Sequence, residues 1–259
     1  MGVLLPSGHR IILKHNHELE LMRASGRILA AVLDAVEEAV GPGVTTGELD
    51  RIAAQVIARA GARASFKGYH GYPKTLCTSV NAQVIHGIPS DDVVLAEGDV
   101  VSVDCGVLHQ GFHADACRTF PVGTIDEESA LLLKVTREAL ELAIAKAVVG
   151  GRLSDIGAAI GSHVKRAGLS VVRDYVGHGI GRSLHEDPDV RNYGRPGRGP
   201  RLEHGMVLAI EPMVNLGGWR CRTLSDGWTV VTRDGSRSAH FEHTVAITKD
   251  GPRVLTLGS

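Results

Sequence analysis

Apolar residues recur at helical spacing in the first part of the chain. In residues 18–40 they stand at every third or fourth position, which is typical of one face of an α-helix. A Gly-Pro-Gly sequence at 41–43 ends this helix. Residues 45–48, Thr-Thr-Gly-Glu, then form a capping box, in which side chains satisfy the first backbone N–H groups of a second helix. We expect that helix to end near Gly61.

A similar pair of helices is predicted further along. Residues 124–127 can cap a third helix, which we expect to run to about Val149. Ser154 can open a fourth helix that ends at Gly168. The order of helix, glycine, helix, glycine therefore occurs twice, and this raises the question of an internal repeat.

The repeat is regular in sequence. Arg-Ala-Gly at 59–61 recurs at 166–168, an offset of 107 positions. At the same offset the strand-like run LAEGDVVSVD (95–104) matches LEHGMVLAIE (202–211), and each run ends in an acid. Chance similarity of Ala/Val-rich helices would explain the helices alone. The strands favour a true repeat, because both place a carboxylate at the end of an apolar run.

A second acid-bearing strand also recurs. FHADACRT (112–119) resembles AHFEHTVA (239–246), which matches Asp115 to Glu242 at an offset of 127. The additional positions fall in a longer connection, residues 219–237. Each half is then predicted to contain two helices followed by two acid-bearing strands.

This order predicts an α+β fold in which helices cover one face of an antiparallel sheet shared by both halves. We expect one catalytic domain, residues 1–259, with pseudo-symmetric halves at about 12–123 and 124–250. No long linker or low-complexity segment interrupts it, and the Gly/Arg/Pro-rich stretch 194–201 is predicted to be a surface loop.

Composition excludes several classes of protein. The formal net charge is −1 and no block of Lys and Arg occurs, which argues against nucleic acid or an anionic membrane as the main partner. No apolar run approaches the roughly 20 residues of a spanning helix, and no secretory signal is evident. The four cysteines are widely spaced and favour reduced thiols. We expect a cytoplasmic protein.

Two aspartates lie in the predicted hairpin. A two-residue loop at 109–110 would place Asp104 opposite Asp115, and one at 110–111 would make them diagonal neighbours on one face. A three-residue loop with a bulge at Gly111 would disturb this parity. In the first two registers the carboxylates lie within about 4.5 to 8 Å, so a cation or a shared proton is needed. The hairpin alone also fits two surface acids beside a turn.

Two glutamates strengthen the metal hypothesis. Glu211 lies within the apolar run MVLAIEPMV and Glu242 within SAHFEHTVAI. Four carboxylates on related strands suit two divalent ions, and an imidazole would favour Mn, Fe, Co or Zn. Asp104 and Asp115 could instead form the acid/base pair of a glycosidase, but that leaves the glutamates and the histidines without a role.

Candidate histidines come from two motifs. GHGIGRSLHEDP supplies His178 and His185, and its glycines argue against the helix of an HExxH zinc motif. Such glycines would let the backbone approach a ligand closely. NAQVIHGIP supplies His86. Four histidines near the site are weaker, outer candidates: His70, His113, His240 and His243. The others are expected at the surface or in the core: His9, His15, His17, His109, His163 and His204.

Taken together, these residues resemble the type I methionine aminopeptidases, metallopeptidases of the pita-bread fold. The resemblance runs from about Ile12 to Asp250. Besides the hairpin with the two aspartates, it rests on four motifs in order: GYHGYPKTLCTSVNAQVIHGIP (68–89), GHGIGRSLHEDP (177–188), AIEPMV (209–214) and FEHTVAIT (241–248).

The resemblance implies a site with two divalent metal ions. Its ligands would be Asp104, Asp115, His178, Glu211 and Glu242, with Asp115 and Glu242 bridging both ions. Asp104 would hold one ion, and His178 and Glu211 the other. The ions would activate water for attack on the first peptide bond, with Glu211 as the proton acceptor.

The resemblance also implies how the substrate binds. His185 would hydrogen-bond the carbonyl oxygen, and His86 would contact the scissile nitrogen. Six side chains would line the methionine pocket, although ordinary core packing is the alternative: Phe66, Tyr69, Tyr72, Cys77, Leu184 and Trp228. Leu184 stands where many relatives have Phe, and Phe66 where some have Cys, which leaves the pocket apolar.

The implied substrates are nascent polypeptides and peptides with an N-terminal methionine and a small second residue. A transient ribosome contact and a monomeric state are further expectations. Prolidases and aminopeptidases P share the five ligands, but they usually carry a large N-terminal domain that we do not expect here. Between His178 and Glu211 there is no room for the helical insertion of type II enzymes. A non-catalytic pita-bread module would have lost ligands, whereas all five positions here hold competent residues.

Overall fold

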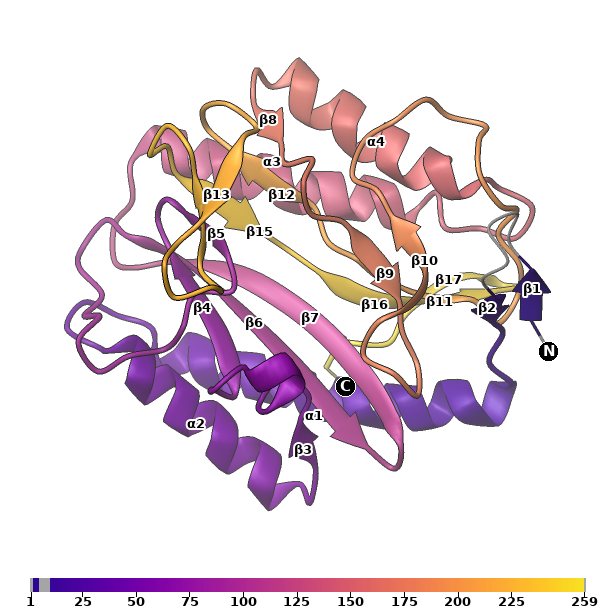
Figure 1. Cartoon of the computed structure of the whole chain (residues 1–259), viewed down its shortest axis with the longest axis horizontal. Helices are drawn as coiled ribbons and strands as arrows, with labels where there is room; N and C mark the ends of the chain where they lie inside the picture. The colour runs from indigo at the N-terminus through magenta and orange to yellow at the C-terminus, as the bar shows by residue number, and fades with distance from the viewer. Residues whose placement is uncertain (1, 5–9, 259) are drawn as a thin grey trace.

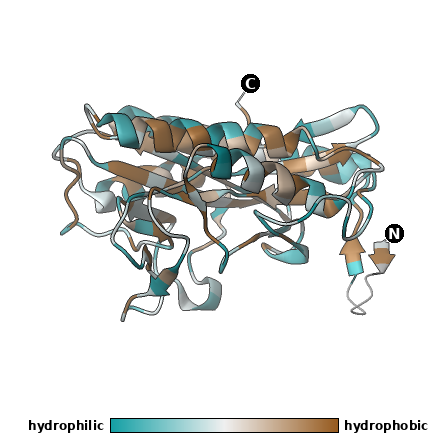
Figure 2. Cartoon of the chain, turned by 90° about the horizontal axis from the view of Figure 1, so that it is seen from above, coloured by the Kyte–Doolittle hydropathy of each residue, from teal (hydrophilic) through white to brown (hydrophobic). Residues whose placement is uncertain are grey.

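The computed structural model describes residues 2–4 and 10–258. In it, two pairs of helices pack against a set of antiparallel strands (Figure 1). Figure 2 shows the helices on one side of the strands, with long loops and the N-terminal strands on the other. No helix among the described residues combines the length and apolar character needed to cross a membrane. The helices are α1 (Asn16–Ala39), α2 (Thr46–Arg59), α3 (Glu127–Ile144) and α4 (Leu153–Arg166).

The strands of each half are short except for one long hairpin. The first half contains β1 (Gly2–Leu4), β2 (Arg10–Ile12), β3 (Arg63–Ala64), β4 (Leu76–Val80), β5 (Gln83–Ile85), β6 (Val100–His109) and β7 (Phe112–Pro121), with a 3₁₀ turn η1 (Tyr69–Gly71). The second half contains β8 (Ser170–Val171), β9 (Gly177–Gly179), β10 (Glu186–Val190), β11 (Val207–Ile210), β12 (Met213–Asn215), β13 (Cys221–Thr223), β14 (Val230–Thr232), β15 (Ser238–His240), β16 (His243–Thr248) and β17 (Gly251–Val254).

The predicted offset of 107 positions relates the helices and loops of the two halves. Helices α2 and α4 each have 14 residues, and in each an acid of the first turn accepts the backbone N–H of the cap residue: Glu48 from Thr45, and Asp155 from Arg152. Isolated backbone bridges join Thr45 to Val94 in the first half and Arg152 to Arg201 in the second. The chain therefore enters its second helix in the same way twice.

The third helix is shorter than its apolar pattern predicts. It begins after Asp126, whose carboxylate accepts a hydrogen bond from the backbone N–H of Ser129, and it ends at Ile144 rather than near Val149. The chain beyond Ile144 turns back through i→i+3 hydrogen bonds such as that from Ala147 N–H to the Ile144 carbonyl. Val149 is 48% exposed, so its apolar character continues the helical period without packing against the core.

The register of the long hairpin decides where its aspartates lie. Strands β6 and β7 turn through Gln110 and Gly111, which both have positive φ, as a tight two-residue hairpin turn requires. Asp104 pairs with Cys117, and Asp115 with Gly106. The two aspartates are therefore diagonal neighbours on one face, which is the second of the predicted registers.

The second half forms a five-stranded sheet in the order β10-β9-β11-β16-β17. Glu211 directly follows β11, and Glu242 directly precedes β16, which pairs with β11. Strand β9, with His178 at its centre, pairs with β11 on its other side. The three strands thus bring two glutamates and one histidine to one end of the sheet.

Strand β7 joins the halves. The backbone N–H of Glu242 donates to the carbonyl of Cys117 at 2.9 Å, and the hydroxyl of Thr244 donates to the carbonyl of Asp115 at 2.8 Å. One apolar core lies under α1 and α2 and contains Leu33 and Val103; another lies under α3 and α4. The result is the predicted α+β arrangement, in which helices cover antiparallel strands contributed by both halves.

Candidate metal centre and substrate cavity

The structure brings all thirteen candidate site residues to one cavity of about 160 Å³. They come from both halves of the chain and from loops up to 176 positions apart in sequence. The lining consists of Phe66, Tyr69, Tyr72, Cys77, His86, Asp104, Asp115, His178, Leu184, His185, Glu211, Trp228 and Glu242.

Three of the acidic and imidazole groups are arranged closely enough to share an ion. One ligand atom each from Asp115, His178 and Glu242 lies within 4.8 Å of the other two. The three residues come from β7, from β9 and from the residue before β16. Asp115 is 4% exposed and Glu242 is 2% exposed, so their charges need compensation from a cation or a proton.

Burial acts on all four carboxylates, and repulsion by neighbouring carboxylates acts on three of them: Asp115, Glu211 and Glu242. Desolvation raises the pKa of Asp104 to about 7, and it raises the pKa of Asp115 well above its usual value, with the charges of Glu242 and Asp104 adding to the effect. Desolvation and neighbouring carboxylates likewise raise the pKa values of Glu211 and Glu242. The protein alone therefore holds these groups in a state that favours a proton or a cation.

Several oxygens in this group have no protein partner. Oδ1 of Asp104, Oδ1 of Asp115 and Oε1 of Glu242 are buried and accept no hydrogen bond from the described residues. Buried polar atoms are nearly always satisfied, so unpaired acceptors at one place are a sign of a missing positive partner. The donor set, carboxylates with one imidazole, therefore fits divalent metal ions.

His178 is oriented for metal binding. Its Nδ1 lies 2.8 Å from the carbonyl oxygen of Gly179, so Nδ1 carries the proton and Nε2 offers its lone pair to the cavity. Nε2 lies 3.7 Å from Oε1 of Glu211 and 4.0 Å from Oδ2 of Asp115. Burial lowers the pKa of His178 to about 3, which keeps the ring neutral as a ligand must be.

The glycines beside His178 serve a different purpose from the one that the sequence suggests. A Cβ on Gly177 would lie 2.3 Å from the carbonyl oxygen of Ala209, and one on Gly179 would lie 2.1 Å from that of Asp187. The close approach is therefore to the neighbouring strands β11 and β10 rather than to a ligand. These close contacts with β10 and β11 fix the position of His178 in the sheet.

An aromatic wall forms the other side of the cavity. The hydroxyl of Tyr72 donates to the carbonyl of Leu76, and its ring packs edge-on against Trp228 at a centroid distance of 5.0 Å. Tyr69 Oη lies 2.7 Å from Nδ1 of His185. Cys77 is buried, and desolvation raises the pKa of its thiol well above the usual value, so it presents a neutral group. The wall is suited to an apolar side chain.

Two imidazoles face the centre without being part of the acidic group. Burial lowers the pKa of His86 to about 4 and also lowers that of His185. The rings of His178 and His185 have centroids 4.2 Å apart. Neutral imidazoles at these positions can donate or accept a hydrogen bond, according to the tautomer.

The outer histidines divide into two groups. His240 belongs to the site, because its Nε2 lies 3.7 Å from Oε2 of Glu211. His113 and His243 instead bind the hydroxyls of Ser65 and Thr256. His70 stacks edge-on against Tyr69, and His9 lies outside the described residues.

Sequence reasoning missed Tyr175 and Thr244. Tyr175 packs edge-on against His86 at 6.1 Å, and Thr244 donates its hydroxyl to the Asp115 carbonyl and accepts from the Asp115 N–H. The only sequence signal for Tyr175 was its position before the Gly-rich motif. For Thr244 it was the neighbouring Glu242.

Comparisons with known proteins identify the class. Residues 20–249 match the model of metallopeptidase family M24, and the chain belongs to that family. It is similar to the methionine aminopeptidase of Clostridium acetobutylicum, with 56% identity over 95% of this chain and 99% of that protein. Methionine aminopeptidase 1 of Mycobacterium tuberculosis is 50% identical, over 97% of each chain.

Solved structures agree with this assignment. A crystal structure of methionine aminopeptidase from Thermotoga maritima superposes with a TM-score of 0.94 at 46% identity, over 95% of this chain and 99% of that one. A prolidase from Pyrococcus furiosus shares the fold more distantly, with a TM-score of 0.74 and 24% identity. The predicted pita-bread fold is confirmed.

Proposed function

We propose that this chain is a metal-dependent exopeptidase that removes the N-terminal methionine from peptides and newly made proteins. The observation that carries the proposal is one cavity whose floor is acidic and whose wall is aromatic and apolar. The floor suits cations that can act on a peptide bond, and the wall suits a methionine side chain. Membership in metallopeptidase family M24 supports the same reaction class.

Two divalent ions, of Co, Mn, Fe or Zn, fit the donor set. Asp104, Asp115, His178, Glu211 and Glu242 would hold them. When bound, such ions would lower the pKa of a water molecule and polarise the peptide carbonyl. The buried oxygens of Asp104, Asp115 and Glu242 support this assignment, because they accept no hydrogen bond from the described residues.

The remaining steps belong to side chains of the protein. Glu211 accepts the proton of the attacking water, because its carboxylate lies in the acidic group that lines the cavity. His185 donates to the carbonyl oxygen of the substrate as negative charge develops there. The hydroxyl of Tyr69 hydrogen-bonds Nδ1 of His185, so Nε2 of His185 is left to donate to the substrate carbonyl. His86 contacts the scissile nitrogen and helps the amine to leave.

The methionine side chain would occupy the aromatic side of the cavity. Leu184 is 3% exposed and lines this pocket with Phe66, Tyr69, Tyr72, Cys77 and Trp228. A small second residue is proposed on the strength of the resemblance to methionine aminopeptidases. The limited cavity, about 160 Å³, fits that preference.

We place the reaction on nascent chains in the cytoplasm, carried out by a monomer that contacts the ribosome only briefly. All four cysteines are free thiols, which fits a reducing compartment. Nucleic acid and membrane are not proposed as partners.

A peptide assay tests the reaction. Purified protein, stripped of metal and then supplied with Mn, Fe, Co or Zn, is given Met-Ala-Ser and, separately, an X-Pro peptide. We expect release of methionine from Met-Ala-Ser and little cleavage of the X-Pro bond. Faster cleavage of X-Pro would assign the chain to the prolidase branch of the fold, and full activity without metal would overturn the metal-dependent mechanism.

A further inference from the structure

Glu211 enters the cavity from a point where the chain passes from one sheet to another. Strand β11 ends at Ile210 in the five-stranded sheet, and β12 begins at Met213 in a three-stranded sheet with β15 and β8. Between them, Pro212 has no backbone N–H to donate. Neither ladder includes Glu211, so other contacts must fix its position.

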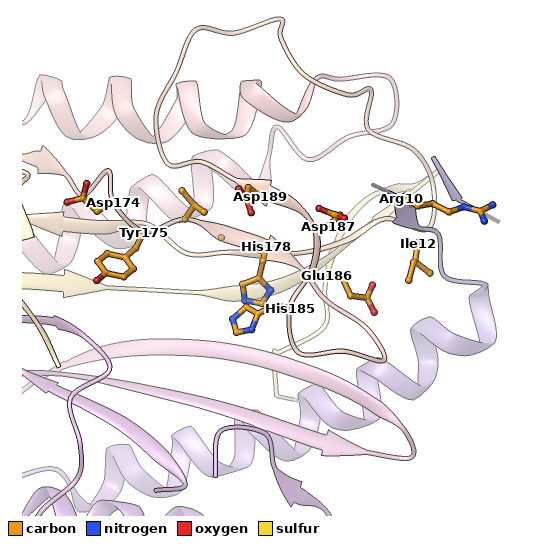
Figure 3. A pocket seen from close by; sticks show the side chains of 11 residues that line it. Arg10, Ile12, Asp174, Tyr175, His178, His185, Glu186, Asp187 and Asp189 are labelled. Atoms are coloured by element: carbon orange, nitrogen blue, oxygen red, sulfur yellow. The ribbon is translucent and has the colours of Figure 1, made fainter. Parts of the chain in front are cut away.

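The side chain of Asn192 makes one of these contacts. Its Nδ2 donates to the backbone carbonyl of Glu211 at 2.9 Å, and Asn192 is fully buried. A buried carbonyl without a partner is costly, so this bond satisfies an acceptor that the strands leave over. Asn192 lies two residues beyond β10; Figure 3 shows Asp187 and Asp189 on that strand and His185 just before it.

The segment that carries Asn192 is itself seated on α4. A Cβ on Gly157 would lie 2.1 Å from the carbonyl oxygen of Arg191, and one on Gly161 would lie 3.4 Å from Cα of Tyr193. The two glycines are four positions apart, so they lie on one face of the helix. The backbone around Asn192 therefore rests directly on α4, and the helix sets the place of the amide.

The side chain of Glu211 is held from three directions. A Cβ on Gly177 would lie 3.3 Å from Cγ of Glu211, so the stem passes close to the backbone of β9. Oε1 lies 3.7 Å from Nε2 of His178, and Oε2 lies 3.7 Å from Nε2 of His240. A rotation of the backbone at Glu211 would move the carboxylate away from both imidazoles. The bond from Asn192 opposes that rotation.

We propose that Asn192 is a positioning residue for Glu211, and that α4 sets its place through Gly157 and Gly161. The amide holds the Glu211 carbonyl at the crossing between the sheets, and this keeps the carboxylate in the acidic group. Asn192 does not belong to the described lining of the cavity, so it acts through Glu211. The inference rests on the proposed removal of N-terminal methionine, in which Glu211 is a metal ligand and the proton acceptor.

A matched pair of substitutions tests the inference. Asn192→Leu keeps the approximate size of the side chain and removes the donor. Asn215→Leu is the control, because Asn215 is also fully buried and its Nδ2 donates to the Gly218 carbonyl at the same 2.9 Å. In both asparagines Oδ1 accepts no hydrogen bond from the described residues. The two variants should therefore show similar decreases in Tm.

Only Asn192→Leu should affect the reaction and the metal. We expect its kcat for Met-Ala-Ser to fall about tenfold or more, because a residue that supports a metal ligand typically contributes this much. Its KM should stay within about twofold of the parent value. Calorimetric titration of the metal-stripped protein with Mn should show binding weakened by about tenfold. Asn215→Leu should match the parent in all three measurements.

A double-mutant cycle shows whether Asn192 acts through Glu211. Glu211→Gln leaves the four other proposed ligands, so Mn affinity remains measurable. Adding Asn192→Leu to Glu211→Gln should cause little further loss of affinity, because the residue to be positioned has already been changed. The full loss in that background would overturn the inference.

Gly157→Ala supplies a second route to the same test, which does not depend on the folding of Asn192→Leu. It keeps the amide, but its methyl group must push the backbone at Arg191 away from α4. We expect weaker Mn binding and a lower kcat than in the parent. Parental values in a folded Gly157→Ala protein would contradict the role given to α4.

The outcomes separate the inference from the proposed function. Parental Mn affinity and kcat in Asn192→Leu would overturn the inference and leave the proposed function intact. Equal losses in Asn192→Leu and Asn215→Leu would also overturn it, because general destabilisation would explain both. A parent protein that binds Mn but releases no methionine would overturn the proposed function, and the Mn titrations would still decide whether Asn192 positions Glu211.

Discussion

The ammonium nitrogen of Lys14 lies 2.5 Å from Oε2 of Glu186, and only 3% and 6% of the two side chains are exposed. Lys14 follows β2, and Glu186 directly follows His185. Oε1 of Glu186 accepts the backbone N–H of Ser183 in the same loop. A Cβ on Gly181 would lie 2.5 Å from Cε of Lys14, so the loop closes tightly around the lysine. The N-terminal segment therefore holds the loop that carries His185.

Removal of one partner should be costly. Lys14→Met leaves Glu186 buried without a counter-charge, and we expect a loss of about 3–5 kcal/mol in the free energy of unfolding, measured in urea. The kcat/KM for Met-Ala-Ser should also fall, because the His185 loop loses its support.

Two further variants control for general damage. Lys14→Met with Glu186→Gln should recover part of the loss, because no buried charge is left unpaired. Arg51→Met breaks an exposed pair with Asp91 and should cost far less stability than Lys14→Met. If the two buried-pair substitutions simply added, the ion pair would not be the cause.

Gly179→Ala tests how the sheet positions His178. The new methyl group would lie 2.1 Å from the carbonyl oxygen of Asp187, so β9 and β10 must separate. We expect a loss of several degrees in Tm and a fall of at least tenfold in kcat as His178 moves. Gly41→Ala is the control, since a Cβ there meets nothing within 4 Å. Equal effects at both glycines would contradict this account of the close approach.

Metal removal should destabilise the fold as well as stop the reaction. Ions that bind only the native state stabilise it by mass action, so a chelator should lower Tm, and added Mn or Co should restore it. In Glu242→Gln, which keeps the size of the side chain, we expect a much smaller rise in Tm on metal addition. The same rise in this variant as in the parent would remove Glu242 from the ligand set.

The acidic group also predicts an unusual pH dependence. Burial raises the pKa of Asp104 from 3.8 to about 7, so in metal-stripped protein the native state holds a proton that the unfolded chain has lost. That stabilisation is complete below about pH 3.8 and is lost as pH rises through about 7. Bound ions favour the ionised carboxylates and should reverse this trend.

Urea titrations at pH 6, 7 and 8 measure this dependence. The metal-stripped protein should become less stable across this range, and the metal-loaded protein should not. Asp104→Asn should show a shallower decline without metal than the parent protein. A metal-stripped parent whose stability rises with pH would contradict the raised pKa.

Much of the fold follows from local patterns in the sequence. The period of apolar residues and the glycines after it locate α2 and α4, because these helices are amphipathic and cap themselves. The predicted end of α3 lies too far along the chain, because Val148 and Val149 continue the apolar period while remaining exposed. Only tertiary packing distinguishes an apolar residue that faces the core from one that faces water.

The sequence likewise predicts some features of the candidate site and not others. Carboxylates such as Asp115 stand out in the sequence because they interrupt buried strands, and the hairpin restricted the distance between Asp104 and Asp115 to a few registers. The choice among these registers depended on the turn at Gln110 and Gly111, which tolerates positive φ at both positions. The contact from Lys14 to Glu186 carries no local signal, because it depends on how distant loops meet.

The hydrogen bond between Cys117 and Glu242 has a consequence for how the site is assembled. Residues before 124 supply only Asp104 and Asp115 to the acidic group, and those after it supply His178, Glu211 and Glu242. Neither part of the chain supplies more than three of these five residues, so the centre exists only where β7 is bonded to the segment that precedes β16.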